Sequence, residues 1–189
     1  MTLPTLFDAT SDPIIVATVN KQLIGSIADD DINGGDGDDT LNGGTGNDVE
    51  HGGFGNDQVN GGDGNDTLFG DAGDDTLNGG TGADNLNGGS GNDKLNGGTG
   101  NDALTGGAGS DTFVFKAGDG HDTITDFTAG GTDDQINLTH SAHLFTSFND
   151  VIQHAHQVGH DTLIDLGGGN NVTLKDVNVH ALTSHDFVL

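Results

Sequence analysis

Residues 34–42 read Gly-Gly-Asp-Gly-Asp-Asp-Thr-Leu-Asn, and the same nine-residue pattern then recurs without a gap as far as Val114. Nine copies follow one another, each of the form Gly-Gly-x-Gly-x-Asp-x-U-x, where U is an aliphatic or aromatic residue. Positions one and four are always glycine, and position six is always aspartate. Position two is glycine except at Asp71, and aspartate is one of the few other residue types that tolerate a left-handed backbone. A repeat this regular predicts a solenoid in which each copy packs against its neighbours.

The composition indicates a chain rich in oxygen ligands. The 189 residues include 35 glycines and 30 acidic residues against 4 lysines, with no arginine or cysteine, and the formal net charge is −26. Glu50 is the only glutamate, so the acidity comes almost entirely from short aspartate side chains on glycine-rich turns. A hard cation such as Ca²⁺ prefers these ligands. Without a cation, repulsion among the carboxylates predicts an unfolded chain.

The charge and the absent motifs argue against several functions. A strongly acidic chain predicts no direct binding to nucleic acid, and no apolar stretch is long enough to insert into a membrane. Neither His-Glu-x-x-His nor Gly-x-Ser-x-Gly occurs, so we expect no catalytic residues and no enzyme activity. Residues 1–20 lack the basic and apolar regions of a Sec-type leader, so we expect no Sec-type export.

The nine-residue period has a physical explanation. The six glycine-rich positions are predicted to form a turn with positive φ angles, and the last three a short strand whose middle residue, U, points inward. Two repeats, 18 residues, would complete one coil, so that copies i and i+2 stack and the U residues form an apolar core. Glu50 occupies one U position, so we expect either that Val49 turns inward there or that the coil is loose. An extra metal ligand formed with His51 is the alternative.

This pattern resembles the RTX (repeats-in-toxin) family, the hemolysin-type proteins with calcium-binding nonapeptide repeats. The resemblance implies an all-β fold, a calcium-binding parallel β-roll (a β-helix-like solenoid) with an N-terminal β cap and a β-rich C-terminal cap containing a short helix. A degenerate copy of the repeat at 25–33, and the sequence Asp111-Thr-Phe-Val-Phe115 with which the repeats end, extend the resemblance beyond the regular copies. The expected domains are an N-terminal capping segment at 1–24, the RTX β-roll at 25–125, and a C-terminal cap with a type I secretion signal at 126–189.

Calcium is expected between stacked turns, where position-six carboxylates of copies i and i+2 meet and carbonyl oxygens of the glycine-rich positions complete the coordination. Seven such pairs lie within the regular copies. The degenerate copy adds the pair Asp30 and Asp48, and a further copy at 117–124 adds the pair Asp102 and Asp122, so about 7–9 ions are expected. Family resemblance adds Asp126 and Asp134. The candidate metal ligands are Asp30, Gly35, Gly37, Asp39, Gly44, Gly46, Asp48, Gly53, Gly55, Asp57, Gly62, Gly64, Asp66, Asp71, Gly73, Asp75, Gly80, Gly82, Asp84, Gly89, Gly91, Asp93, Gly98, Gly100, Asp102, Gly107, Gly109, Asp111, Gly118, Gly120, Asp122, Asp126 and Asp134.

The flanking segments are predicted to close the ends of the roll. Residues 13–24 hold two β-prone runs around Asn20-Lys21, which indicate a hairpin or edge strands. Beyond the repeats we expect strands at 112–115, 122–127 and 133–138, a helix at 147–155, and a hairpin at 161–175. His154 and His156 could share a strand face and bind a transition metal, but surface histidines in an acidic cap are the favoured interpretation.

The chain ends in Asp186-Phe-Val-Leu189, which resembles the end of the signals read by type I (ABC) exporters, while a closing β-strand is compatible with the same residues. The resemblance implies a protein exported by the type I secretion apparatus of a Gram-negative bacterium. It would be unfolded at low calcium and fold cooperatively on extracellular Ca²⁺. Two other roles stay open: a carbohydrate-binding module that contacts an extracellular polysaccharide or a host surface, and the C-terminal secretion portion of a larger extracellular enzyme.

Overall fold

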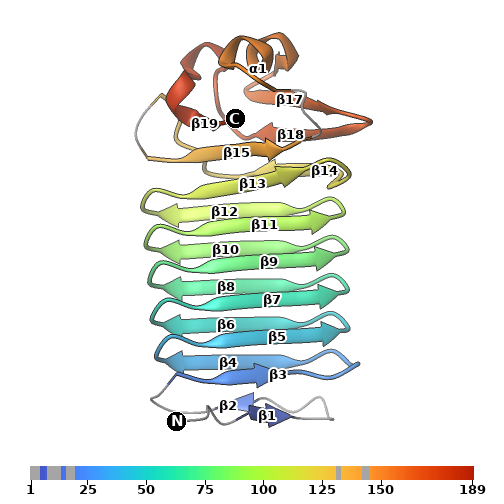
Figure 1. The fold of residues 1–189 in the computed structure, drawn as a ribbon, viewed down its shortest axis with the longest axis vertical. Helices are drawn as coiled ribbons and strands as arrows, with labels where there is room; N and C mark the ends of the chain where they lie inside the picture. Colours follow the sequence, from blue (N-terminus) through green and yellow to red (C-terminus); the bar gives the residue numbers. More distant parts are fainter. Residues whose placement is uncertain (1–4, 8–13, 16–19, 131–132, 142–144) are drawn as a thin grey trace.

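The chain winds into a parallel β-solenoid with a small cap at its C-terminal end (Figure 1). The computed structural model describes residues 5–7, 14–15, 20–130, 133–141 and 145–189. The strands form two sheets: sheet A in the order β1-β3-β5-β7-β9-β11-β13-β15-β19, and sheet B in the order β16-β17-β18-β14-β12-β10-β8-β6-β4-β2. The all-β parallel roll predicted from the repeat is therefore confirmed.

Successive strands of the roll alternate between the two sheets. Sheet A contains β1 (Thr5–Phe7), β3 (Gln22–Ile24), β5 (Thr40–Thr45), β7 (Gln58–Asp63), β9 (Thr76–Thr81), β11 (Lys94–Thr99), β13 (Thr112–Lys116), β15 (Gln135–His140) and β19 (Phe187–Val188). Sheet B contains β2 (Ile14–Ile15), β4 (Asp31–Asp36), β6 (Val49–Phe54), β8 (Thr67–Ala72), β10 (Asn85–Ser90), β12 (Ala103–Ala108), β14 (His121–Ile124), β16 (Ala155–Val158), β17 (Asp161–Gly167) and β18 (Asn170–Leu174).

One coil of the repeat tract takes 18 residues, as predicted. Leu41 is paired with Val59, and Val59 with Leu77, each 18 residues further along. The strands are longer than the predicted three residues, because positions one to three also join the sheets: Gly44 pairs with Gly62. Each regular strand therefore spans positions seven to nine and one to three, which leaves positions four to six in the turn.

Position-eight side chains fill the interior between the two sheets. Leu41, Leu68 and Leu77 are each at most 1% exposed, and burying a leucine contributes about 1.5–3 kcal/mol. The same row continues to Leu23 and Ile32 on the N-terminal side, beyond the regular copies. Stacked leucines thus supply a core that no single repeat could form.

Glu50 faces this core without disturbing the coil. It is paired with Ile32 on one side and Leu68 on the other and is fully buried, whereas Val49 is 37% exposed. Both predictions for this residue, an inward Val49 and a loose coil, are wrong, because strand alternation turns position eight inward whatever its side chain. Burial, and then the nearby carboxylate of Asp48, raises the pKa of Glu50 well above its ordinary value.

The N-terminal strands continue the winding. β2 pairs in parallel with β4 in sheet B, and β3 pairs in parallel with β1 and β5 in sheet A. The hairpin predicted around Asn20-Lys21 is therefore wrong, since its two arms belong to different sheets; of the two, β2 is an edge strand. Residues 1–4, 8–13 and 16–19 of the predicted capping segment lie outside the described residues.

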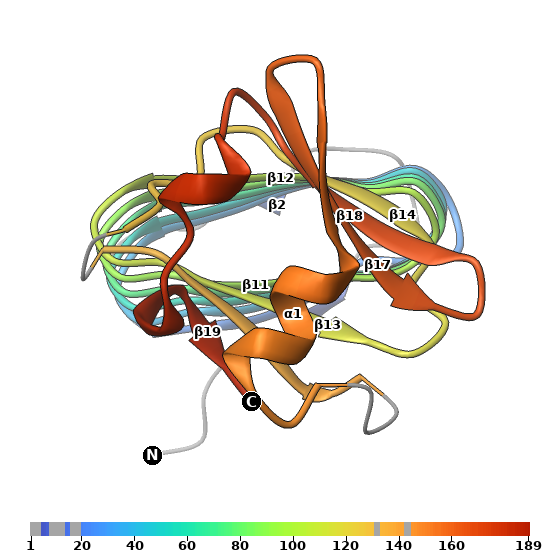
Figure 2. The same cartoon turned by 90° about the horizontal axis from the view of Figure 1, so that it is seen from above.

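The C-terminal elements lie across the other end of the roll (Figure 2). Helix α1 (Phe148–His154), with Ser147 as its N-cap, and the antiparallel hairpin of β17 and β18 agree with the predicted helix and hairpin. The 3₁₀ helices η1 (Val179–Ala181) and η2 (Ser184–Asp186) lead to β19, which pairs in parallel with β15. Within the described residues, no helix has the length and apolar character needed to cross a membrane.

Candidate metal centres

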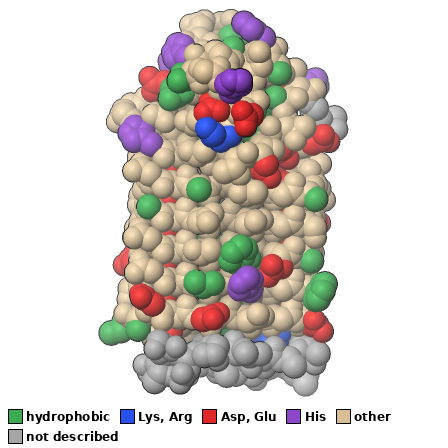
Figure 3. All heavy atoms as spheres, turned by 180° about the vertical axis from the view of Figure 1, so that it is seen from behind, with side chains coloured by type: hydrophobic (Ala, Val, Ile, Leu, Met, Phe, Trp, Pro, Cys, Tyr) green, Lys and Arg blue, Asp and Glu red, His purple; other side chains and the backbone are tan. Residues whose placement is uncertain are grey.

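Two rows of position-six residues follow the two edges of the roll. Each residue directly precedes a strand, except Asp122, which lies within β14 near its start, so the row at the start of the sheet A strands is called ladder A and the row at the start of the sheet B strands ladder B. Ladder A consists of Lys21, Asp39, Asp57, Asp75, Asp93, Asp111 and Asp134. Ladder B consists of Asp30, Asp48, Asp66, Asp84, Asp102 and Asp122. All twelve aspartates are at most 6% exposed, and the coils visible in Figure 3 are covered mainly by uncharged surface.

One hydrogen bond is repeated along both ladders. The backbone N–H of Asp57 donates to Oδ1 of Asp75 over 2.7 Å, and the N–H of Asp66 donates to Oδ1 of Asp84 over 2.8 Å. All nine carboxylate pairs proposed from the sequence are stacked neighbours of this kind. The structure adds a tenth pair, Asp111 with Asp134, at 3.2 Å.

The other carboxylate oxygen lacks a donor. Among the described residues, a buried Oδ2 without a hydrogen-bond partner occurs at Asp48, Asp57, Asp66, Asp75, Asp84, Asp93 and Asp102. A Cβ placed on Gly70 would lie 2.5 Å from both Oδ2 of Asp75 and the carbonyl oxygen of Gly88 in the next coil. Buried oxygens without donors are costly, and closely spaced oxygens are what a hard cation binds. The arrangement therefore fits a calcium ion between stacked turns.

The glycines at positions two and four allow neighbouring coils to approach each other closely. Gly53 and Gly55 have φ angles of 109° and 130°, which favour glycine. A side chain on either would overlap the carbonyl oxygen of Gly35 or Gly37 in the preceding coil. The exception, Asp71, has a φ of 71°, as its tolerance of a left-handed backbone predicts. The carbonyl groups of the predicted glycine ligands thus face the neighbouring coil.

The family model for the RTX calcium-binding nonapeptide repeat (HemolysinCabind) matches residues 22–50, 51–86 and 78–113, which contain most of both ladders. This tract consists of RTX calcium-binding repeats. Two solved structures match the chain, each with 20% sequence identity. The extracellular lipase LipA from Serratia marcescens has a TM-score of 0.44, and the AlgE6R3 subunit of the Azotobacter vinelandii mannuronan C5-epimerase has a TM-score of 0.30.

The compared structures differ in how much of their length they share with this chain. The lipase match covers 93% of this chain, which spans only 40% of the lipase, and the epimerase match covers 96% of this chain and 84% of that subunit. The comparison with curated proteins finds no match. The RTX assignment therefore rests on the repeats themselves.

The RTX ladders hold carboxylates that resist ionisation in the absence of a metal. Burial has the largest effect and raises the pKa of these carboxyl groups, the backbone hydrogen bond lowers it, and neighbouring carboxylates raise it further. These effects raise the pKa from 3.8 to about 7 at Asp75 and Asp122. They raise it to about 6 at Asp48, Asp57, Asp84 and Asp111. A divalent cation in the gaps would oppose this shift, because it stabilises the charged form.

The first residue of ladder A is a lysine. Its Nζ lies 2.6 Å from the carbonyl oxygen of Gly34, 3.0 Å from that of Asp36, and 3.0 Å from Oδ2 of Asp39. These contacts show that carbonyl groups at positions one and three also point into a gap between turns, and neither position was among the predicted ligands. Counting back nine residues from Asp30 would have brought Lys21 into the ladder.

The predicted ligands beyond the regular copies have different environments. Asp122 and Asp134 end the two ladders, whereas Asp126 lies outside them and accepts hydrogen bonds from the N–H groups of Gly106 and Gly107 at 3.0 and 2.8 Å. The sequence did not reveal that Asp134 follows Asp111, because 23 residues separate the two instead of 18. Calcium binding by all of these residues stays a prediction.

The histidines do not form the metal sites considered above. His51 lies on the outer face, where its ring stacks on Phe69 at 4.4 Å and its Nδ1 lies 3.0 Å from Oδ2 of Asp71. The proposed ligand pair with Glu50 is therefore wrong, since the two side chains lie on opposite faces of β6. His154 ends α1 and His156 lies in β16, so they do not share a strand. Within the described ranges, no three His, Cys, Asp or Glu side chains gather into a metal site.

Proposed function

We propose that this chain is a secreted, non-catalytic RTX protein whose roll folds when Ca²⁺ occupies the gaps along the two ladders. The observation that carries the proposal is the row of buried Oδ2 atoms without donors among the described residues, each on a carboxylate fixed through Oδ1. Folding places twelve aspartates in these two rows, and the four lysines of the whole chain cannot neutralise them. A divalent cation in each gap would remove this imbalance.

The ligands of each ion would come from two stacked turns. Position-six carboxylates would supply the charge, and carbonyl oxygens of positions one to four would complete a shell of about six to eight oxygens. Because each ion joins two coils, binding at one gap would order the turn that forms the next. Calcium binding and folding would then be a single cooperative process, with about 7–9 ions bound.

Export is the second part of the proposal. In the low-calcium cytosol, carboxylate repulsion would keep the chain unfolded and able to pass through the type I (ABC) apparatus of a Gram-negative bacterium. Outside the cell, roughly millimolar calcium would fill sites of the affinity typical of extracellular modules. Residues 126–189 would carry the signal, ending at Asp186-Phe-Val-Leu189, residues 25–125 would form the calcium-dependent roll, and residues 1–24 would cap it.

Circular dichroism of the purified chain in calcium and in excess EDTA tests the folding step. A coil spectrum in EDTA that converts to a β spectrum on addition of calcium is expected, with a steep, cooperative titration. Isothermal titration calorimetry would count the bound ions, and magnesium provides the control because it prefers a smaller, octahedral site. A β spectrum that persists in EDTA at neutral pH would contradict calcium-dependent folding.

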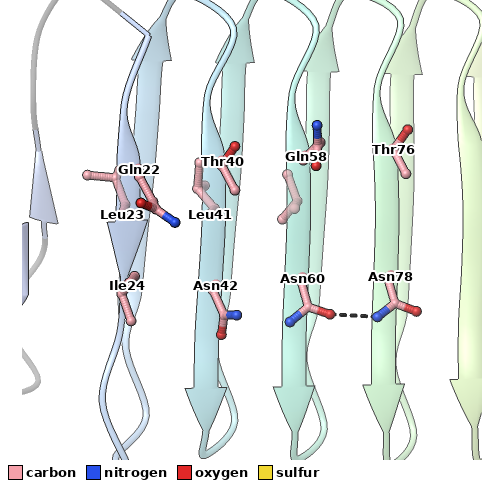
Figure 4. A pocket seen from close by; sticks show the side chains of 11 residues that line it. Gln22, Leu23, Ile24, Thr40, Leu41, Asn42, Gln58, Asn60, Thr76 and Asn78 are labelled. Atoms are coloured by element: carbon pink, nitrogen blue, oxygen red, sulfur yellow. Dashed lines mark hydrogen bonds between the residues drawn. The ribbon is translucent and has the colours of Figure 1, made fainter. Parts of the chain in front are cut away.

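A hollow on the outer face of sheet A supports polysaccharide binding as a second candidate function. Figure 4 shows Asn42, Asn60 and Asn78 in one row along this face, with a hydrogen bond of 2.6 Å between the last two side chains. A further hollow shares Asn78 and contains Lys94 and Lys116, two of the four lysines. Amides suit hydroxyl groups and the lysines suit sugar carboxylates.

A glycan array probed with the calcium-loaded protein tests this candidate. Binding to an acidic polysaccharide that is lost in K94Q/K116Q, with folding unchanged, would support it. Retention of binding in this variant, or no binding to any glycan, would count against it and leave the calcium-dependent scaffold as the function.

A further inference from the structure

Lys21 occupies an aspartate position in ladder A. It lies 9 residues before Asp30 and 18 before Asp39, in the register of position six. Its backbone N–H donates to Oδ1 of Asp39 over 2.7 Å, the same bond that joins Asp57 to Asp75. The backbone of the ladder is therefore unchanged at this point, and the difference lies in the side chain.

The ammonium group of Lys21 lies among oxygens of the following turn. Besides the two carbonyl oxygens and Oδ2 of Asp39, its Nζ lies 3.4 Å from Oδ1 of the same carboxylate. Lys21 is only 1% exposed, so this charge is held away from water. A buried lysine is stable only when its charge is matched and its donors are used, and both conditions hold here.

Asp39 differs from the aspartates that follow it. Both of its carboxylate oxygens have partners, at Lys21 N and Lys21 Nζ, whereas Asp57 and Asp75 each have a buried Oδ2 without one among the described residues. Ladder B starts differently. Among the described residues, the buried Oδ1 of Asp30 and the buried Oδ2 of Asp48 both lack a hydrogen-bond partner. The carboxylate next to the lysine is thus satisfied within the chain itself.

We infer that the Lys21 ammonium is a built-in cation that takes the place of a metal ion in the first gap of ladder A. This inference rests on the proposed function, because it gives the gaps between turns the role of cation sites. The gap between Lys21 and Asp39 then binds no calcium, and the N-terminal coil is held to the roll at that edge by a charge that cannot dissociate. Calcium is needed only for the later gaps of ladder A and for ladder B.

Two substitutions test this inference by calcium titration. K21D restores an aspartate at position six and should increase the number of bound calcium ions by one, measured by isothermal titration calorimetry. K21M removes the charge but keeps an apolar side chain of similar length. It should leave the ion count unchanged while raising the calcium concentration at the folding midpoint several-fold, measured by circular dichroism. K94D and K94M are the matched controls, because Lys94 is exposed in β11 of the same sheet.

The outcomes separate this inference from the proposed function. An unchanged ion count in K21D, or a folding midpoint of K21M equal to that of K94M, would overturn the role of Lys21 even if the wild-type chain folds only with calcium. If the wild-type chain folds in EDTA, calcium-dependent folding fails. A lower melting temperature of K21M than of K94M in EDTA would then still support Lys21 as the internal cation.

Discussion

The backbone N–H of Asp57 donates to Oδ1 of Asp75 over 2.7 Å, while Oδ2 of Asp75 has no hydrogen-bond partner among the described residues. One carboxylate thus has two tasks: one oxygen positions the preceding turn, and the other is available to a cation. Because the two tasks use different atoms, substitutions can separate them.

Replacing Asp75 with asparagine or with alanine should give different results. Asparagine keeps an oxygen that can accept from Asp57 N–H but removes the charge, so D75N should bind at least one calcium ion fewer. D75A should lose the same ions and, at saturating calcium, be less stable by a further ~1–3 kcal/mol, because a buried N–H loses its acceptor. Calorimetry and chemical denaturation measure the two effects. D74N, at an exposed neighbour, should change neither, and an unchanged ion count in D75N would refute the pairing of stacked carboxylates.

Stability should depend on pH in opposite ways with and without calcium. The pKa of Asp75 is raised from 3.8 to about 7, and that of Asp48 from 3.8 to about 6. At pH values between the unfolded and the folded pKa of each group, the metal-free folded state therefore binds more protons than the unfolded state. Lowering the pH from about 8 to about 5 should therefore stabilise the metal-free roll. In calcium, the same change should weaken apparent affinity, because protons compete for the ligands. Circular dichroism in EDTA and calcium titrations at several pH values measure both trends; parallel trends would contradict this account.

Glu50 should destabilise the roll. Its carboxylate is fully buried, and neither oxygen has a hydrogen-bond partner among the described residues. E50L should raise the free energy of unfolding by at least about 1 kcal/mol, with E50Q intermediate because its amide also lacks partners. Because the pKa of Glu50 is raised in the folded state, the gain for E50L should increase as the pH rises above 4.5. Denaturation curves in calcium at two pH values measure this, and a less stable E50L would indicate that the carboxylate has an unrecognised partner.

The position-eight core should be sensitive to truncation. Leu77 is 1% exposed, and L77A should lower the free energy of unfolding in calcium by about 2–5 kcal/mol through lost burial and a cavity. V49A is the control, since Val49 is 37% exposed and its truncation should cost far less. Equal losses in the two variants would contradict the inward and outward assignment of β6 and β9.

Deleting residues 187–189 should abolish export from a strain that carries an RTX-type exporter, measured as protein in the culture medium. The same deletion removes β19, whose Phe187 pairs with Ile136, so folding in calcium must be measured separately on purified protein. I136A is the matched control, because it weakens the same end of sheet A and leaves the C-terminal residues intact. Normal export of the deletion variant would remove the proposed signal.

The repeat made most of the roll predictable. A fixed aspartate at every ninth position identifies which carboxylates stack, because the 18-residue coil is imposed by two strands and two turns. The register also places Glu50 inward, although its chemistry argued for a local distortion. Position in a strand outweighed side-chain preference there, because neighbouring coils fix the alternation on both sides.

The ends of the tract were less predictable, because the repeat pattern is lost there. Lys21 does not resemble an aspartate, and the residues before it do not resemble the repeat, so only the count of nine links it to ladder A. Asp134 was predicted to be a ligand from family resemblance, but its position next to Asp111 was not predicted, because 23 residues separate the two instead of 18. The length of the strands was not predicted either. Positions one to three join the strands, because carbonyl and N–H groups of stacked glycines pair as well as those of larger residues.

The 18-residue register also controls the dimensions of the molecule. Removing residues 52–69 would delete one coil, keep every later strand in its own sheet, and shorten the stack by about 4.8 Å. Removing only nine residues would shift each later strand to the opposite sheet and carry the C-terminal cap half a turn around the axis. An even number of repeats gained or lost therefore changes only the height of the protein, whereas an odd number also changes the direction in which its cap faces, without designing a new turn or a new core.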